Sequence, residues 1–267
     1  MKRRAFITTG CTLGIMPVMG MPGISEKNEQ KATGEGQYFE WITYQLHLGN
    51  KQRLVADYYR DVAIPALNKA GIMNVGVFNV KHGPNDPTLH VIIPHPSLES
   101  VVTLNNKLLD DKSFVQAGGR FLNAPLSDMA FVSMEKTILK AFDSLPEMQV
   151  PKQKKANSPR IIQVRTYEAP SLVASKKKIQ MFDEGGETAI FQKTGLQPVL
   201  MGETIAGNRV PNLVYMLAFD DMNDLAKKWE VFGKDPDWLK LRANTYYAET
   251  VSRINDWIWT PAACSQI

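Results

Sequence analysis

The sequence predicts an α+β protein in which one βαββαβ unit occurs twice. Three observations carry this prediction: an amphipathic helix pattern recurs one domain length later, strand-like runs flank it in both copies, and turns containing Gly or Pro separate the runs at matching places. A repeat of this length indicates a duplicated domain, because solenoid repeats are much shorter.

The repeat is clearest in one helix of each copy. Mostly apolar positions spaced i, i+3, i+7 and i+10 form a stripe that would face a core, and each position of the first copy lies 124 residues before its counterpart. The stripe consists of Leu98, Val101, Asn105 and Leu108 in the first copy and of Met222, Leu225, Trp229 and Phe232 in the second. Phe114 and Trp238 keep the same offset, as do Gly71 and Gly195.

The composition is that of an ordinary globular protein. The 267 residues suit two domains of about 100 residues, each large enough to bury a core. The formal charge of +4 falls if Lys2, Arg3 and Arg4 are removed, because this leaves 28 basic against 27 acidic residues. A nearly balanced charge gives no electrostatic argument for nucleic acid as a partner, so we expect none.

Residues 1–25 have the features of an export signal. A basic start is followed by Arg3-Arg4-Ala5-Phe6-Ile7 and a modestly apolar run without an acidic residue. Paired arginines before x-Phe-Ile resemble the twin-arginine signal, so we expect export to the periplasm. The apolar run is too short and too polar to anchor the chain, so we expect no transmembrane span in the mature protein. Cleavage after Gly20 and cleavage near Ser25 both stay open.

Two cysteines bear on processing and stability. Cys11 lies inside the signal, and lipidation there is the less favoured alternative because Thr8-Thr9-Gly10 lacks the usual Leu three residues before the cysteine. Cleavage would leave Cys264 alone, so an intrachain disulfide could not form. Residues 26–36 are polar and contain Gly, which predicts a flexible leader.

The first domain, residues 37–142, begins with a strand predicted over 38–46 from its aromatic and β-branched residues. Asn50 is a candidate N-cap for a helix from about residue 51, which Gly71 ends. Further strands are predicted over 72–80, 88–93 and 129–142, with the helix that begins near Leu98 between the last two.

Residues 143–159 contain three prolines and a basic cluster, and we interpret them as a solvated linker. The second domain, residues 160–260, repeats the order of the first, and residues 261–267 would form a tail. Ser171 is a candidate N-cap for its first helix, with Leu172, Ile179, Phe182 and Ile190 turned inward. Its strands are predicted over 161–167, 197–204, 212–219 and 249–259. The order β-α-β-β-α-β defines a ferredoxin-like unit, an antiparallel four-stranded sheet with two helices on one face.

Short motifs agree in order and spacing across the two copies. They are Arg165-Thr166-Tyr167 in a first strand, Gly195 before a second, His90 ahead of Ser97-Leu98-Glu99, and Asp235-Pro236-Asp237-Trp238. On these motifs the chain resembles the NIPSNAP family over about 38–142 and 160–260. The copies depart from the pattern in part: the first has Ile42 for the family's Arg and Phe114 for its Trp, and the second has Tyr215 where the first has His90.

The resemblance implies a dimeric α/β-barrel, in which two ferredoxin-like sheets pack face to face around a shared interior. With both units in one chain, the barrel would close within a monomer. This arrangement also covers the second face of each sheet, which the helices leave bare. The family has no established common reaction, and its relatives by fold include cofactor-free monooxygenases, isomerases and haem-handling enzymes, so function stays open.

Alternation along the strands selects a candidate site in the barrel interior. In the third strand of the first copy, Leu89, Val91 and Ile93 form an aliphatic face that we assign to the helices, so His90 and its expected match Tyr215 would look into the barrel. By the same logic the more polar face of each first strand would point inward. The candidate ligand-binding group is Glu40, Tyr44, His90, Arg165, Tyr167 and Tyr215.

Two interpretations of this group stay open. In one, Arg165 acts as a fixed cation and His90 as a base or hydrogen-bond donor toward a small anionic or carbonyl-bearing ligand. In the other, which the residues alone favour, the group is a satisfied internal network in which Arg165 pairs with Glu40 and the tyrosines bond to each other. If a ligand binds, we expect it to be anionic and to contact Arg165.

The sequence lacks the motifs of several common catalytic and cofactor sites. The sequence has no nucleophile elbow, phosphate loop or paired-cysteine motif. The spacing of His82, His90 and His95 matches no standard metal pattern, so we expect neither a metal nor a cofactor. We expect a small-ligand-binding or protein-interaction module that is a monomer or homodimer. The alternative is a cofactor-independent monooxygenase- or isomerase-like enzyme using a polar barrel cavity, with His90 as its weak catalytic candidate.

Overall fold

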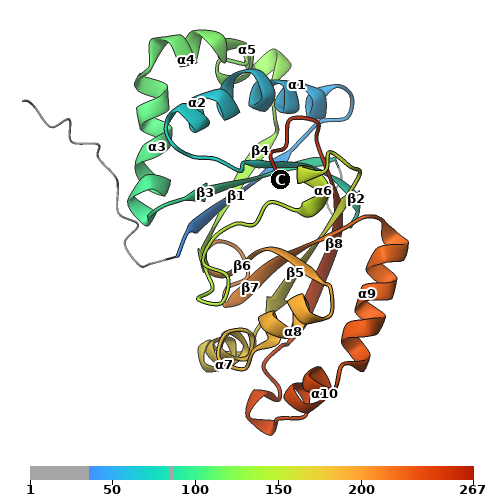
Figure 1. Ribbon diagram of the computed structural model, residues 1–267. Helices are drawn as coiled ribbons and strands as arrows, with labels where there is room; N and C mark the ends of the chain where they lie inside the picture. Colours follow the sequence, from blue (N-terminus) through green and yellow to red (C-terminus); the bar gives the residue numbers. More distant parts are fainter. Residues whose placement is uncertain (1–35, 84–86) are drawn as a thin grey trace, which may run out of the picture. The chain divides into compact units, whose positions relative to one another are not determined.

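The computed structural model describes residues 36–83 and 87–267 (Figure 1). The expected export signal, including Cys11, and the expected leader apart from its last residue lie outside these described residues. Within the described ranges, every helix is too short or too polar to cross a bilayer.

The first half of the chain has the predicted βαββαβ order. Its first helix has three parts, because a π-helical turn, Tyr59–Ala63, joins α1 to α2. Pro65 is the second residue of α2, directly after the π-helical turn, and its missing N–H interrupts the hydrogen-bond ladder of the continuous helix there. The elements are β1 (Tyr38–Gln45), α1 (Lys51–Tyr58), α2 (Ile64–Lys69), β2 (Gly76–His82), β3 (Thr88–His95), α3 (Leu98–Asp110), α4 (Lys112–Ala117), α5 (Gly119–Leu122) and β4 (Ser133–Ala141).

The second half repeats this order after the connecting segment. Ser171 caps the first helix as predicted, because its Oγ accepts a hydrogen bond from the backbone N–H of Ala174. Asn50, the other candidate cap, makes no such bond. The elements are α6 (Lys152–Lys155) in the connection, then β5 (Ile161–Glu168), α7 (Leu172–Phe182), α8 (Glu187–Lys193), β6 (Gln197–Ala206), β7 (Asn212–Phe219), α9 (Met222–Lys234), α10 (Pro236–Arg242) and β8 (Arg253–Pro261).

The eight strands form one closed antiparallel barrel in the order β1-β3-β2-β8-β5-β7-β6-β4. Each half supplies four neighbouring strands, and the halves join where β2 pairs with β8 and β4 with β6. The predicted fold, two ferredoxin-like units in an intramolecular α/β-barrel, is confirmed. Closure removes the unpaired edges that an isolated four-stranded sheet would expose.

Three hydrophobic cores follow from this arrangement. One fills part of the barrel interior and includes Phe39, Phe78, Leu139 and Trp259. The other two lie outside the barrel, one between the strands of the first half and its helices and one in the same place in the second half. The helices of each half therefore cover the outer face of the sheet, and Figure 1 shows them on opposite sides of the strands.

The helix stripes are only partly buried. Val101 and Phe232 are in the core as predicted, whereas Leu98 and Met222 are 45% and 41% exposed. Leu172, expected to face inward, is 73% exposed. Each of these three exposed residues is the first residue of its helix, so its place in the period does not bring it into the core.

The connecting and C-terminal segments are more ordered than the sequence suggested. Leu145, Met148 and Gln153 of the expected solvated linker are buried, and the backbone N–H of Gln149 bonds to the carbonyl of Val199. In the expected tail, the Ser265 hydroxyl accepts a hydrogen bond from the backbone N–H of Val77, and Ile267 is fully buried. Both segments therefore pack on the barrel.

Candidate functional site

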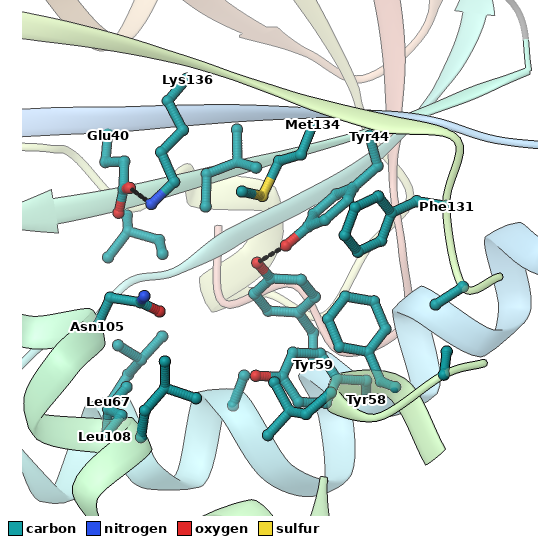
Figure 2. Close-up of a pocket in the computed structure, with 18 of the residues that line it drawn as sticks. Glu40, Tyr44, Tyr58, Tyr59, Leu67, Asn105, Leu108, Phe131, Met134 and Lys136 are labelled. Atoms are coloured by element: carbon teal, nitrogen blue, oxygen red, sulfur yellow. Dashed lines mark hydrogen bonds and ion pairs between the residues drawn. The ribbon is translucent and has the colours of Figure 1, made fainter. Parts of the chain in front are cut away.

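A cavity of about 540 Å³ lies in the first half, between the outer face of the sheet and helices α1 to α5 (Figure 2). This volume is within the range of small-molecule sites in proteins. Most of its lining is apolar or aromatic, and the polar side chains gather at one end, as Figure 2 shows for Glu40, Asn105 and Lys136. The apolar lining includes Leu67, Ile93, Leu104, Leu108, Phe114 and Phe121.

The local sequence explains why these side chains converge. Alternation along β1 and β4 places Glu40, Tyr44 and Lys136 on the outer face of the barrel. Asp111 ends α3 and caps α4 by accepting the backbone N–H of Ser113, so the chain turns sharply there. The turn brings Phe114 and the following α5 back over the strands to close the cavity.

The aromatic wall is held in place by ring contacts and one hydrogen bond. Tyr58 stacks on Phe121 with ring centroids 4.1 Å apart and an interplanar angle of 12°. The hydroxyls of Tyr44 and Tyr59 are 2.9 Å apart and share a hydrogen bond. Burial raises the pKa of Tyr58 to about 12 and raises the pKa of Tyr44 and Tyr59 further. All three rings therefore stay neutral and can only offer a hydroxyl or a face.

The polar end of the cavity carries a charge pair. Lys136 Nζ lies 2.5 Å from Glu40 Oε1, and His95 Nε2 lies 3.4 Å from Glu40 Oε2. Burial by itself would raise the pKa of Glu40, but His95 and Lys136 outweigh it and hold that pKa below its ordinary value. Glu40 is therefore ionised at neutral pH, and the lysine balances its charge.

The six residues of the expected barrel site lie in three separate places, so the expectation of one shared interior is wrong. Only His90 faces into the barrel. Glu40 and Tyr44 line the cavity of the first half. Arg165, Tyr167 and Tyr215 lie on the outer face of the second half, where Arg165 packs on Tyr167 and Tyr167 bonds to Tyr215.

The error has two physical causes. Polar side chains of the first strands find partners on the outer face, as Glu40 does with Lys136 and Tyr44 with Tyr59, so polarity does not mark the interior face. The register also places Val214 opposite Thr166, as His90 lies opposite Thr43, so Val214 and not Tyr215 is the counterpart of His90. A shift of one residue moves a side chain to the other face of a sheet.

Arg165 does not pair with Glu40, contrary to expectation. Its Nε lies 3.4 Å from Asp256 Oδ2, and its guanidinium lies over the rings of Tyr167 and Trp229, at 5.3 Å and 5.0 Å from their centroids. The expected bond between tyrosines does exist for Tyr167 and Tyr215, whose hydroxyls are 2.9 Å apart. Arg165 is therefore part of the packing of the second half.

His90 is enclosed by aromatic rings and hydroxyls. It stacks on Trp259 with centroids 4.3 Å apart, and its Nδ1 accepts a hydrogen bond from Trp41 Nε1 at 3.1 Å. Burial lowers the pKa of His90 to about 3. A histidine with this pKa is neutral at physiological pH and a poor general base, because the best base has a pKa near the working pH.

Sequence reasoning missed several residues of the cavity. Tyr58 and Tyr59 are adjacent at the point where the π-helical turn begins, and both line the cavity. Two of the missed residues could have been found from the sequence. Lys136 alternates along β4 with Thr137, which faces the barrel interior, and Asn105 is the one polar position of the helix stripe. Phe114, which the sequence marked only by its place in the repeat, is 7% exposed and also lines the cavity.

The histidines and carboxylates of the described residues do not gather into a metal site. The described ranges contain no cluster of three or more His, Cys, Asp or Glu side chains that could hold an ion. His82, His90 and His95 point to different surroundings, since His90 is bound to Trp41 and His95 to Ser100. The chemistry of the cavity is therefore that of aromatic faces, hydroxyls and one ion pair.

Solved structures with the same fold are distant in sequence. A protein from Lactobacillus acidophilus described as a putative monooxygenase has a TM-score of 0.55 at 9% identity, covering 85% of this chain and 94% of its own. A putative monooxygenase from Fusobacterium nucleatum has a TM-score of 0.54 at 7% identity, covering 85% and 93%. An uncharacterized NIPSNAP-like domain protein from Burkholderia xenovorans has a TM-score of 0.35 at 20% identity, covering 39% and 86%. At identities of 9% and 7%, the likeness to the two putative monooxygenases concerns the fold alone.

The family is decided by the sequence of the two halves. No curated protein matches the chain. The NIPSNAP family model matches it twice, over residues 39–146 and 162–266, which together are most of the chain. These segments coincide with the two ferredoxin-like halves of the barrel, and the expected resemblance is confirmed. The chain therefore belongs to the NIPSNAP family and carries the family's domain twice.

Proposed function

We propose that this protein binds a small, mostly apolar aromatic molecule in the cavity of its first half. The observation that carries the proposal is the composition of that cavity: about 540 Å³ lined mostly by rings and aliphatic side chains, with its charged and amide groups at one end and tyrosine hydroxyls in the aromatic wall. An apolar body would gain from leaving water, and one polar group would fix its orientation. The barrel closes within one chain, so a monomer contains the whole site.

The polar end favours a neutral hydroxyl or carbonyl group on the ligand. Lys136 already neutralises Glu40, and a carboxylate placed beside Lys136 would also lie close to the charge of Glu40. A hydroxyl can instead donate to Glu40 while Asn105 supplies a further donor and acceptor. The anionic ligand expected at Arg165 is replaced by this proposal, because Arg165 is already paired with Asp256 and packed on two rings.

Binding is proposed here and not catalysis. The two solved proteins described as putative monooxygenases share the fold at 9% and 7% identity, and a shared fold does not carry an activity. His90, the catalytic candidate from the sequence, lies in the barrel and has a pKa of about 3. The alternative of a cofactor-independent monooxygenase or isomerase relied on His90, which does not line the proposed binding cavity.

The test compares two probes that differ in one group. Thermal unfolding and titration calorimetry would measure binding of 1-naphthol and 1-naphthoate to the protein, since a ligand of the folded state raises Tm by mass action. We expect the naphthol to raise Tm and the naphthoate to raise it less. Leu108→Trp should abolish both effects by filling the cavity, and Leu239→Trp, on the exposed side of α10, should leave them unchanged.

Three outcomes would contradict the proposal. The first is an equal response of the protein and of Leu108→Trp, because binding would then lie elsewhere. The second is consumption of the naphthol in the presence of dioxygen, followed by mass spectrometry, because this would favour the enzymatic alternative. Absence of any response across neutral aromatic probes of this size would also sink the binding proposal.

We also propose that the chain is exported through its twin-arginine-like start and works in the periplasm. The support is the sequence Arg3-Arg4-Ala5-Phe6-Ile7 followed by a polar leader. Fractionation of the producing cell, with N-terminal sequencing of the recovered protein, tests this. Replacement of both arginines by lysine should retain the protein in the cytosol, and a periplasmic yield that does not depend on the arginines would overturn the proposal.

A further inference from the structure

A second cavity lies at one end of the barrel and is separate from the helix-covered cavity. Its volume is about 310 Å³, at the lower end of the range for ligand sites. Residues from both halves line it, because the ends of β1, β4, β5 and β8 meet there with the turn between β6 and β7. We call this cavity the barrel mouth. None of its lining residues belongs to the cavity in Figure 2.

The inner end of the barrel mouth is a corner of two indole rings. Trp41 and Trp257 have ring centroids 6.3 Å apart and an interplanar angle of 89°. Trp41 is fixed, because its Nε1 donates to His90 Nδ1 at 3.1 Å. Trp257 packs on Gly83, where a Cβ would lie 2.3 Å from the indole. The corner therefore presents rigid ring surface to whatever enters.

The outer part of the barrel mouth is a ring of polar side chains that hold each other. Asn208 Nδ2 donates to Glu135 Oε2 at 3.0 Å, and Asn255 Nδ2 donates to Glu168 Oε1 at 2.9 Å. Arg209 also approaches Oε1 of Glu168, at 3.6 Å. Among the contacts of the described residues, one oxygen of each carboxylate is thus left for a ligand. The side chains are ordered before binding, which lowers the entropy cost of binding.

The charges of the barrel mouth balance. Two carboxylates, Glu135 and Glu168, lie with two guanidinium groups, Arg209 and Arg253, among neutral amides and hydroxyls. A free anion or cation would meet both signs of charge among the lining residues and gain little. A neutral ligand with many hydroxyls would interact with both the carboxylates and the guanidinium groups, because a hydroxyl can donate to a carboxylate and accept from a guanidinium or an amide.

We infer that the barrel mouth binds a neutral polyhydroxylated ring, such as a pyranose sugar. The C–H groups on one face of such a ring would pack on the indole corner, since the negative face of an aromatic ring attracts positively polarised hydrogens. The hydroxyls at the ring edge would reach the fixed polar ring. This site goes beyond the proposed apolar site and does not depend on it.

The experiment is saturation-transfer NMR on the full-length protein with D-glucose, D-galactose, D-mannose and myo-inositol, followed by calorimetry for each compound that responds. We expect at least one compound to receive saturation at its C–H protons. Glu135→Ala, which changes an exposed side chain, should weaken its affinity about tenfold by removing a charged acceptor. Trp257→Leu should weaken it by a similar factor through loss of the ring surface.

The control is Asn105→Leu, which changes only the other cavity and should leave the saccharide affinity unaltered. Loss of 1-naphthol binding in this variant with retained saccharide binding would show that the two sites are distinct. The inference is overturned if none of the four compounds binds, or if the binding that is found is the same in Glu135→Ala. Failure of the naphthol test alone leaves the saccharide result standing, so the two ideas fail separately.

Discussion

The two halves of this protein share one fold, but a cavity lies between the sheet and the helices of the first half, whereas aromatic side chains fill the equivalent positions of the second half. Equivalent positions of the duplicated helices show the cause: Asn105 lines the cavity, whereas Trp229 in its place reaches the sheet and donates to Gln163 Oε1 at 2.7 Å. Leu67 likewise corresponds to Phe191, whose ring lies 5.8 Å from Trp229. Side-chain size at a few facing positions thus decides whether a duplicated layer holds a ligand or fills itself.

The halves also differ in how deeply they bury charge. In the first half, Glu40 pairs with Lys136, whose side chain is 37% exposed. In the second half, Lys178 and Glu187 are 2.7 Å apart with side chains 7% and 3% exposed. Burial raises the pKa of Glu187 despite the opposing effect of Lys178. The stability of the second half therefore depends on an intact Lys178–Glu187 pair, whereas water can still reach the Glu40–Lys136 pair of the first half.

The largest expected effect comes from breaking the buried pair of the second half. Lys178→Met should destabilise the protein by about 3–5 kcal/mol at neutral pH, because Glu187 is left buried without a partner. The pKa of Glu187 should rise further above its unfolded value, so the variant should be most stable below pH 4.5 and lose stability as pH rises. Urea unfolding across pH measures this.

Two controls accompany that prediction. Lys176→Met, on the exposed side of the same helix, should change stability by less than about 0.5 kcal/mol. The double variant Lys178→Met/Glu187→Leu should recover most of the loss, since no charge remains buried. A single variant as stable as the parent at pH 7 would show that the pair is not needed.

The second prediction tests the filled position directly. Trp229→Ala should cost about 2–4 kcal/mol, slightly less than for a fully buried tryptophan, and should leave Gln163 without its indole donor. Denaturant unfolding measures the loss, with Val231→Ala, a 55% exposed position of the same helix, as the matched control. If Trp229→Ala also gains affinity for 1-naphthol, side-chain size alone explains why only the first half has this cavity. An unchanged stability of Trp229→Ala would contradict the role given to the tryptophan.

A smaller effect is expected at the polar end of the cavity. Glu40→Gln should cost about 1–2 kcal/mol at pH 7, because a charged hydrogen-bond acceptor is lost. The pKa of Glu40 is below its ordinary value of 4.5, so its contribution is full above that value and is lost as pH falls through the folded pKa. The stability of the parent and the variant should therefore converge in acid. Glu147→Gln serves as the exposed control, and parallel curves would refute the prediction.

The smallest expected change in stability comes from making the first half resemble the second. Asn105→Trp should fill the cavity and stabilise the protein by about 1 kcal/mol, as cavity-filling substitutions commonly do. It should at the same time abolish binding of 1-naphthol in calorimetry. Retention of naphthol binding together with the added stability would show that the ligand does not occupy this cavity.

The sequence by itself determined the duplication, the order of the elements and the family. The helical stripe that begins at Leu98 and returns at Met222 is a local pattern, and strand alternation and turn residues are also local, so no tertiary information was needed. The closed barrel was expected from the family resemblance, and the need of each sheet to cover its second face supported that expectation.

Only the tertiary structure decided which face of each strand carries the site. Both faces are buried in this three-layer arrangement, one by helices and one by the barrel interior, so alternation separates the faces without saying which is which. Tyr215 was assigned to the wrong face through a shift of one residue, and Tyr58, from a helix, could not be linked to β1 at all. The cavity exists because side chains from distant segments fail to fill the space between them, and no local pattern encodes that sum of volumes.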